Sequence, residues 1–349
     1  MVRPGARLIA EGTADKPIVF TSSRPPGERR AGDWGGVLLL GQAPTNAHDP
    51  DGKPTSGHVE GLTARGSFGG DRIDDDSGVM RWVRIEYSGV AIGPNNEING
   101  LTLAGVGRGT VIDHVAVRHT VDDCFEFFGG TVDAHHLLCQ SAGDDAFDWD
   151  LGYTGRLQFL IALDMSEVSG AHGIEGDSQA SALATTPRSA PTVFNATLCS
   201  PVTEFAGERY GVLARNGTAG QIHNALIIGF DAGLDVRGRM TALSLDHLVF
   251  GGQRIGAVAY AETSPEAGGA VEDDDEGFDE LAVYSANNLV DPKGLPECTG
   301  AGPRPFAAAE LHADALAPPD DGFFDPTARF VGAIRDSDDN WLVPTWVGD

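Results

Sequence analysis

Residues 114–161 read HVAVRHTVDDCFEFFGGTVDAHHLLCQSAGDDAFDWDLGYTGRLQFLI, and this stretch decides the fold. One apolar pattern recurs in it three times, as HVAVRHT, HHLLCQS and LQFLI. The spacing is nearly constant, because Val115 and Leu137 are 22 residues apart and Leu137 and Leu160 are 23 apart. A fixed period of this length indicates an internal repeat.

A second series of short strands follows the first at a fixed offset, as in CFEFFGG and AFDWDLG. Aligning its members predicts one apolar column and, beside it, a mostly polar one. The apolar column is Leu101, Phe125, Phe147, Ile174, Val212 and Leu234. The neighbouring column is Thr102, Glu126, Asp148, Glu175, Leu213 and Asp235. Such alternation is typical of strands that bury one face.

A repeat of about 22 residues that carries two or three short strands predicts an all-β parallel β-helix, a solenoid with one core along its axis. The 47 glycines among 349 residues suit the corners of such a stack, where the backbone needs positive φ. A β-sandwich or a propeller is the competing fold. Both are disfavoured because two-residue hairpin turns between the strands are missing.

The repeat predicts β-helix coils over residues 1–260. Residues 261–349 are expected to form an acidic loop, the last coil and an irregular C-terminal cap, with the tail from 317 folding back over the last coil. The first strands already look like the middle of a folded pattern, so we expect a further segment upstream.

The net charge is −27, from 51 acidic and 24 basic residues, which excludes a protein that grips nucleic acid by charge. No apolar run is long enough to insert into a membrane. The cysteines, at positions 124, 139, 199 and 298, include no CxxC pair and make a poor disulfide framework. We expect Cys139 and Cys199 to be buried free thiols.

Several long motifs resemble one family: GTADKPIVFTSS, GDWGGVLLLGQAPTN, NEINGLTLAGVGRGT and PPDDGFFDPTARFVGA. They look like secreted bacterial right-handed parallel β-helix proteins, often described as cell-surface lipoproteins of Bacteroidetes and myxobacteria. The resemblance implies a right-handed β-helix that is extracellular or at the cell surface. It implies no defined biochemical activity.

The densest polar cluster falls on three successive coils, where carboxylates stack about 4.8 Å apart. Like charges at that spacing repel, so the cluster calls for cations or raised pKa values. Calcium is the predicted ion, because it takes six to eight oxygen ligands. The predicted metal ligands are Asp122, Asp123, Glu126, Asp144, Asp145, Asp148, Asp150, Glu175 and Asp177.

The same coils resemble, in motif order, the polygalacturonases, a family of right-handed β-helix glycosidases with NTD, DD, GHG and RIK motifs. The resemblance implies catalytic roles for Asp123, Asp144, Asp145 and His172, with Arg215 at the RIK lysine position. Leu213 stands where that family has arginine. A polysaccharide lyase is a third possibility, in which calcium and a basic residue act together, and the candidate bases on neighbouring coils are Arg209, Arg215 and Arg237.

One pair of aromatic residues and one pair of histidines are predicted to be structural. Phe127 and Trp149 share a register and are expected in the core. His135 and His136 are consecutive in a strand, so they should point to opposite faces and not chelate one ion.

The leading hypothesis is a calcium-binding β-helix with a structural role or a binding role toward a polysaccharide or a cell-surface protein. The alternative is a glycan-degrading enzyme. We also expect that the chain can associate with copies of itself, end to end or side by side.

Overall fold

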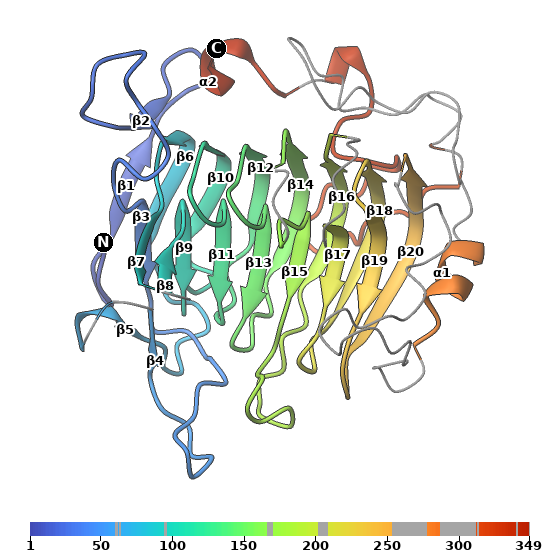
Figure 1. Cartoon of the computed structure of the whole chain (residues 1–349), viewed down its shortest axis with the longest axis horizontal. Helices are drawn as coiled ribbons and strands as arrows, with labels where there is room; N and C mark the ends of the chain where they lie inside the picture. The colour runs from blue at the N-terminus through green and yellow to red at the C-terminus, as the bar shows by residue number, and fades with distance from the viewer. Residues whose placement is uncertain are drawn as a thin grey trace.

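Two parallel sheets run side by side through the computed structural model, and successive turns of the chain add one strand to each (Figure 1). The fold is a right-handed parallel β-helix, as predicted. The structure describes residues 1–348, apart from 60, 61, 63, 94–95, 166–169, 202–208, 253–277, 287–311, 313 and 340.

The larger sheet has nine strands, in the order β1-β6-β10-β12-β14-β16-β18-β20, with β2 also paired to β6. Their bounds are β1 Leu8–Glu11, β2 Ile18–Phe20, β6 Gly78–Glu86, β10 Val111–Arg118, β12 Ala134–Gln140, β14 Arg156–Leu163, β16 Thr192–Cys199, β18 Ala219–Ile228 and β20 Ala242–Gly251.

The smaller sheet has seven strands, in the order β19-β17-β15-β13-β11-β9-β3. They are β3 Val37–Leu40, β9 Leu101–Ala104, β11 Phe125–Phe128, β13 Phe147–Asp150, β15 Ile174–Gly176, β17 Tyr210–Ala214 and β19 Ala232–Val236. Two antiparallel pairs lie outside these sheets: β4 Gly57–His58 with β5 Ser67–Phe68, and β7 Val90–Gly93 with β8 Asn96–Ile98. The described α-helices, α1 Glu280–Ala286 and α2 Pro344–Val347, are both too short to cross a membrane.

The predicted register is confirmed across the smaller sheet. Phe125 pairs with Leu101 on one side and with Phe147 on the other, and the pairing continues through Ile174 to Val212. The rings of Phe125 and Phe147 stack with their centroids 5.3 Å apart. This apolar column lies in the core between the sheets, so burial of one strand face sets the register.

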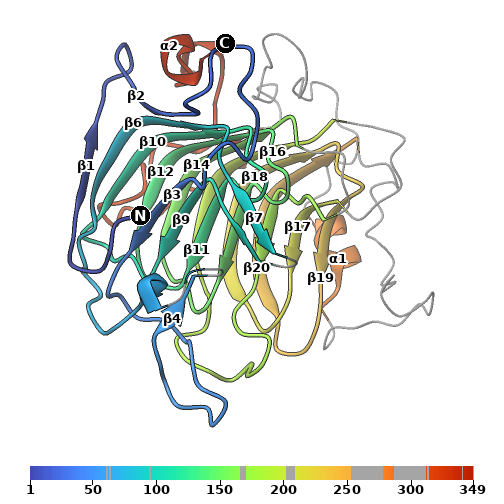
Figure 2. The same ribbon diagram turned by 60° about the vertical axis from the view of Figure 1, so that its left-hand side comes forward.

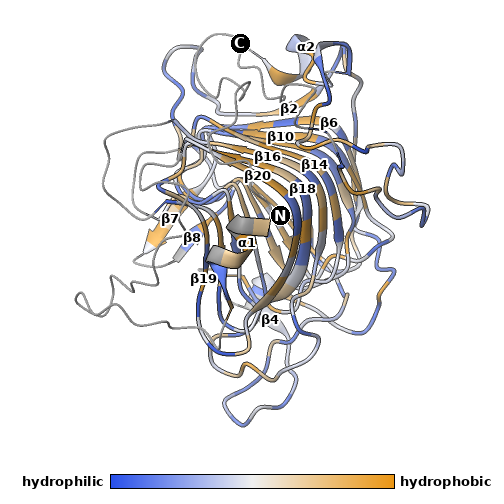
Figure 3. Cartoon of the chain, turned by 90° about the vertical axis from the view of Figure 1, so that its right-hand side faces the viewer, coloured by the Kyte–Doolittle hydropathy of each residue, from blue (hydrophilic) through white to orange (hydrophobic). Residues whose placement is uncertain are grey.

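The predicted core positions Phe127 and Trp149 are confirmed, since both are fully buried. Phe127 stacks on Tyr153, and the Trp149 indole N–H donates to the Thr218 hydroxyl at 3.0 Å. Seen from the end of the stack, apolar and polar residues alternate along the strands (Figure 3).

A corner in the larger sheet overturns one prediction. Seven of its strands, from β6 to β20, each contain one non-glycine residue at positive φ, at matching positions on successive coils: Trp82, His114, His136, Phe159, Asn195, Asn224 and His247. A left-handed residue breaks the two-residue alternation of a strand. His135 and His136 therefore do not point to opposite faces, and both line one pocket.

The cysteine prediction is wrong. Cys124 and Cys139 form a disulfide that joins β12 to the residue just before β11, with their Cα atoms 5.6 Å apart. Cys199 is also disulfide-bonded. Free thiols were expected from wide sequence spacing, but each coil of the solenoid returns the chain to the same place. Structural disulfides are typical of oxidising compartments outside the cytosol.

The last coil is covered by α1 instead of by the C-terminal tail (Figure 3). The Glu280 carboxylate of α1 accepts the backbone N–H of Val236 at 3.1 Å, and Phe278 and Val283 pack on the core. These contacts close the apolar end of the stack, which would otherwise expose unpaired strand edges.

The tail runs back along the outer face of the larger sheet toward the first coils (Figures 1 and 2). Asn224 holds the backbone of Leu316, and Asn195 donates to the carbonyl of Phe330 at 2.7 Å. Further along, the buried Trp346 of α2 donates to the Val83 carbonyl of β6 at 3.1 Å. The tail is therefore a strap across the coils and not a lid on the last one.

Candidate functional site

The nine predicted metal ligands lie on or beside three neighbouring strands, β11, β13 and β15 of the smaller sheet. We call these nine carboxylates the acidic cluster. Register pairs Glu126 with Asp148 and Asp148 with Glu175, as predicted. Because Phe125 and Phe147 turn inward, the alternation of the strand turns the following carboxylates outward.

At the corner before these strands, buried side chains bind the backbone of the next coil. Asp123 Oδ1 accepts the N–H of Asp145 at 2.9 Å, and Asp145 Oδ1 accepts the N–H of His172 at 2.6 Å. His172 Nδ1 accepts the N–H of Tyr210 at 3.0 Å. All three side chains are buried. They form a ladder that ties four coils together.

One arginine of β17's coil faces the cluster. Arg215 pairs with Glu175 and, at 3.1 Å, with Asp177. The carboxylates of Asp148 and Asp150 each keep one buried oxygen, Oδ1, with no hydrogen-bond partner in the described part of the chain. An unpartnered buried carboxylate oxygen is costly, so it marks a place for a proton or a cation.

Burial and mutual repulsion raise the pKa of most of the cluster. The pKa of Asp150 rises to about 7, because of burial and then the charge of Asp177. Glu175 also reaches a pKa of about 7 by burial, against the opposing charge of Arg215. Burial lifts the pKa of Asp144 to about 6. The pKa values of Asp123, Asp145, Asp148 and Asp177 are raised, first by burial and, for the first three, also by neighbouring carboxylates.

The pKa of His172 is lowered, whereas the pKa values of the carboxylates are raised. Burial, with the charges of Arg215 and Arg237, lowers its pKa to about 3, so the ring is neutral at physiological pH. Its Nδ1 accepts a backbone N–H, which leaves Nε2 as the protonated nitrogen, 3.7 Å from Glu175. This fixed tautomer suits a structural histidine better than a proton shuttle.

Within the acidic cluster, three groups of side chains bring one ligand atom each to within 4.8 Å of the others, and a fourth such group, Asp113 with His114 and His136, lies on the larger sheet. The three groups of the cluster are Asp122 with Asp123 and Asp144, Asp123 with Glu126 and Asp148, and Asp145 with His172 and Glu175. The first two are purely carboxylate sets, which are the hard oxygen donors that calcium prefers. Seven of the nine predicted ligands thus gather in these groups, and Asp150 and Asp177 lie beside them.

The residues predicted for catalysis are also brought together, but their bonds limit what they can do. Asp123 and Asp144 offer oxygens within 4.8 Å of each other, closer than the roughly 6.5–9.5 Å that admits a water in an inverting glycosidase. Arg215 is held by two carboxylates, so it is not free to act as a base.

Two other arginines considered for lyase chemistry are paired as well. Arg209 is fully buried against Asp231, at 3.2 Å. Arg237 binds Asp235 at 2.8 Å and the Tyr210 hydroxyl at 2.9 Å.

Residues that sequence reasoning missed also shape the cluster. The Asn99 amide donates to Glu126, and the charge of Glu97, on β8, raises the pKa of Asp144. Both residues come from the segment before β9, and no spacing in the sequence links them to the acidic coils.

A comparison with protein-family models matches residues 1–276 to a pectate-lyase-like beta helix domain. Neither the curated proteins nor the solved structures contain a significant match. The family match agrees with the predicted parallel β-helix. The narrower resemblance to bacterial surface lipoproteins stays a prediction.

Proposed function

The chain belongs to the pectate-lyase-like β-helix domain family, and on this premise we propose an extracellular or cell-surface β-helix with a glycan-related role that binds calcium in its acidic cluster. Domains of this family are typically extracellular, which agrees with the disulfide between Cys124 and Cys139. Its partner would be a polysaccharide or a cell-surface protein.

The observation that carries the calcium proposal is the pair of buried, unpartnered oxygens on Asp148 and Asp150. They lie in a cluster of nine carboxylates that Arg215 alone cannot neutralise. Calcium would supply the missing positive charge, and several carboxylate oxygens could coordinate it at once. Bound between coils, it would replace repulsion by attraction and so stabilise the stack.

The test is thermal unfolding of the whole chain after chelator treatment, with calcium or magnesium added back. At a calcium concentration about 100 times Kd, stabilisation of about 2.7 kcal/mol should raise the Tm by about 4 °C. The double variant Asp148→Asn, Asp150→Asn should lose most of that rise. Asp51→Asn, on an exposed loop, is the matched control. A Tm indifferent to calcium in the unaltered protein would sink the proposal.

A second candidate, glycan cleavage, is favoured by one observation: the pKa of Asp144 near 6 suits a general acid. Purified protein with acidic polysaccharides should then release reducing ends, or unsaturated products if a lyase. Asp144→Asn should abolish that release, whereas the exposed-loop control Asp51→Asn should leave it unchanged. Absence of products under all conditions leaves the binding role and removes the enzyme.

A further inference from the structure

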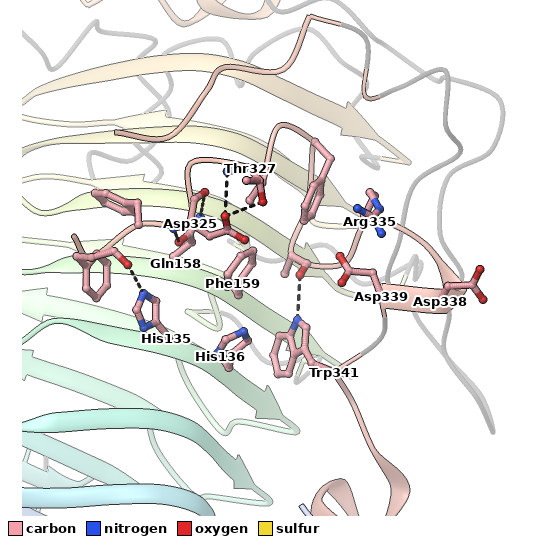
Figure 4. A pocket seen from close by; sticks show the side chains of 15 residues that line it. His135, His136, Gln158, Phe159, Asp325, Thr327, Arg335, Asp338, Asp339 and Trp341 are labelled. Atoms are coloured by element: carbon pink, nitrogen blue, oxygen red, sulfur yellow. Dashed lines mark hydrogen bonds between the residues drawn. The ribbon is translucent and has the colours of Figure 1, made fainter. Parts of the chain in front are cut away.

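A cavity lies on the larger sheet, away from the acidic cluster, between the C-terminal strap and strands β12 and β14 (Figure 4). Its volume is about 550 Å³, within the range of small-molecule sites. The sheet supplies His136 and Phe159, and the strap supplies Phe330 and Trp341. None of these residues belongs to the acidic cluster.

The floor of this strap cavity is aromatic. Phe159 stacks on His136 with ring centroids 4.8 Å apart, and Trp341 meets the His136 ring edge-on at 5.1 Å. The Trp341 N–H is already used, donating to Ala333 at 2.9 Å. The rings thus offer apolar and π-electron surface, which attracts the apolar face of a sugar ring or a cation.

Most polar groups around the cavity are already bonded. The side-chain oxygen of Gln158 accepts the N–H of Asp325, and its amide nitrogen donates to the Asn195 side chain. His135 is hydrogen-bonded to the Phe323 carbonyl at 3.0 Å. Arg335 also lines the cavity, and its Nε pairs with Asp336, which lies outside the lining, at 2.9 Å. Gln158 and His135 therefore have little capacity left for a ligand, whereas Arg335 keeps its positive charge at the cavity.

Three carboxylates outnumber the single arginine in the lining, Arg335, so the net charge around the cavity is negative. Asp338 and Asp339 line the cavity mouth, exposed, with no side-chain hydrogen bond in the described part of the chain. Asp325 bonds Thr327 through Oδ1 only. Burial lowers the pKa values of His135 and His136, so neither ring adds positive charge at neutral pH.

We propose that the strap cavity is a binding site for a small organic cation, a sugar ring bearing a protonated amine. The ring would lie on the aromatic floor and the ammonium group would face the carboxylate of Asp339, while Asp325 and Asp338, on either side of it, would add negative potential (Figure 4). The proposal does not depend on calcium, because it uses the other sheet and none of the acidic cluster.

The experiment compares ligands that share a ring and differ in charge. Binding of glucosamine, glucose and N-acetylglucosamine to the calcium-loaded whole chain is measured by calorimetry at pH 6, where the amine is protonated. Glucosamine should bind about tenfold more tightly than either neutral sugar, and the difference should shrink in high salt. Equal affinities, or no binding of glucosamine, would overturn the proposal.

Variants assign the binding to this cavity. The double variant Asp338→Asn, Asp339→Asn keeps the shape of the cavity and should lower the affinity for glucosamine about tenfold. Asp320→Asn, exposed on the same strap but outside the lining, should change nothing. Trp341→Phe retains a ring while shrinking the floor, and should weaken all three sugars. If the double variant binds as the unaltered protein does, the cation is held elsewhere and the proposal fails.

Discussion

The Oδ1 atom of Asp145 lies 2.6 Å from the backbone nitrogen of His172, one coil further along the stack. The backbone nitrogen of Asp145 in turn donates to Asp123 at 2.9 Å. Each buried side chain therefore satisfies an N–H group of its neighbouring coil. Residues that the motif order places in a catalytic centre are here part of what aligns the coils.

Asp145→Ala should destabilise the fold, because it leaves the N–H of His172 buried without an acceptor. The expected loss is about 1–3 kcal/mol in the free energy of unfolding. Asp145→Asn keeps a carbonyl oxygen at the same place and removes a buried charge, so it should cost less. Urea unfolding of both variants measures the difference, and equal losses would argue against the hydrogen bond as the cause.

Stability without calcium should fall as the pH rises from about 4 to about 7. The folded protein holds protons on Asp150 and Glu175, whose pKa values are near 7, whereas the unfolded chain releases them near pH 4. The proton-linked stabilisation is complete below the unfolded pKa and is lost as the pH passes the folded one.

Calcium should reverse this trend, since it competes with protons for the same oxygens and binds more tightly at higher pH. Melting curves at several pH values, with chelator and with calcium, test both statements. A chelator-treated protein that is as stable at pH 7.5 as at pH 5 would contradict the raised pKa values.

Removing the disulfide by Cys124→Ala with Cys139→Ala should cost about 3 kcal/mol, since the bridge closes a loop of 15 residues. The loss should match that caused by a reductant if this bridge dominates the effect. Denaturant unfolding, with mass spectrometry of alkylated protein to count thiols, measures it. Full alkylation of Cys124 in the native, unreduced protein would show that the bridge is absent.

Trp346→Ala should release the end of the strap from the first coils. The side chain is fully buried, packs edge-on against Trp82 at 5.5 Å, and bonds Val83. Loss of such a contact costs about 3–5 kcal/mol when the fold responds as a whole. Limited proteolysis should then cut near residues 341–348 well before the coils unfold.

Thr345→Ala is the matched control, because it removes only an exposed hydroxyl bond to Ala14. Cleavage as slow in Trp346→Ala as in this control would mean that the strap is held elsewhere.

Much of the fold was predictable because the structural repeat of a solenoid appears as a regular period of apolar residues in the sequence. The apolar column from Leu101 to Leu234 aligned correctly, and so did the neighbouring carboxylates Glu126, Asp148 and Glu175. Each coil repeats one local pattern of burial, and local alternation is visible without knowing any long-range contact.

The predictions that failed involve contacts between segments with no shared period. Cys124 and Cys139 meet because a corner brings two strands together, and His135 and His136 share a pocket because a left-handed residue breaks the alternation. The strap lies where asparagines at successive corners can hold its backbone, a placement that nothing within residues 317–348 encodes by itself.

The sequence by itself determined the coil period, the inward and outward faces of the strands, and the stacking of acidic residues on three coils, since these depend on neighbours along the chain. Only the tertiary structure decided which carboxylates bond the next coil and which keep an unpartnered oxygen. It alone also assembled the strap cavity. Hydrogen-bond partners and cavities depend on distances between coils and on contacts with segments that are distant in the sequence. The period of the repeat does not determine those distances.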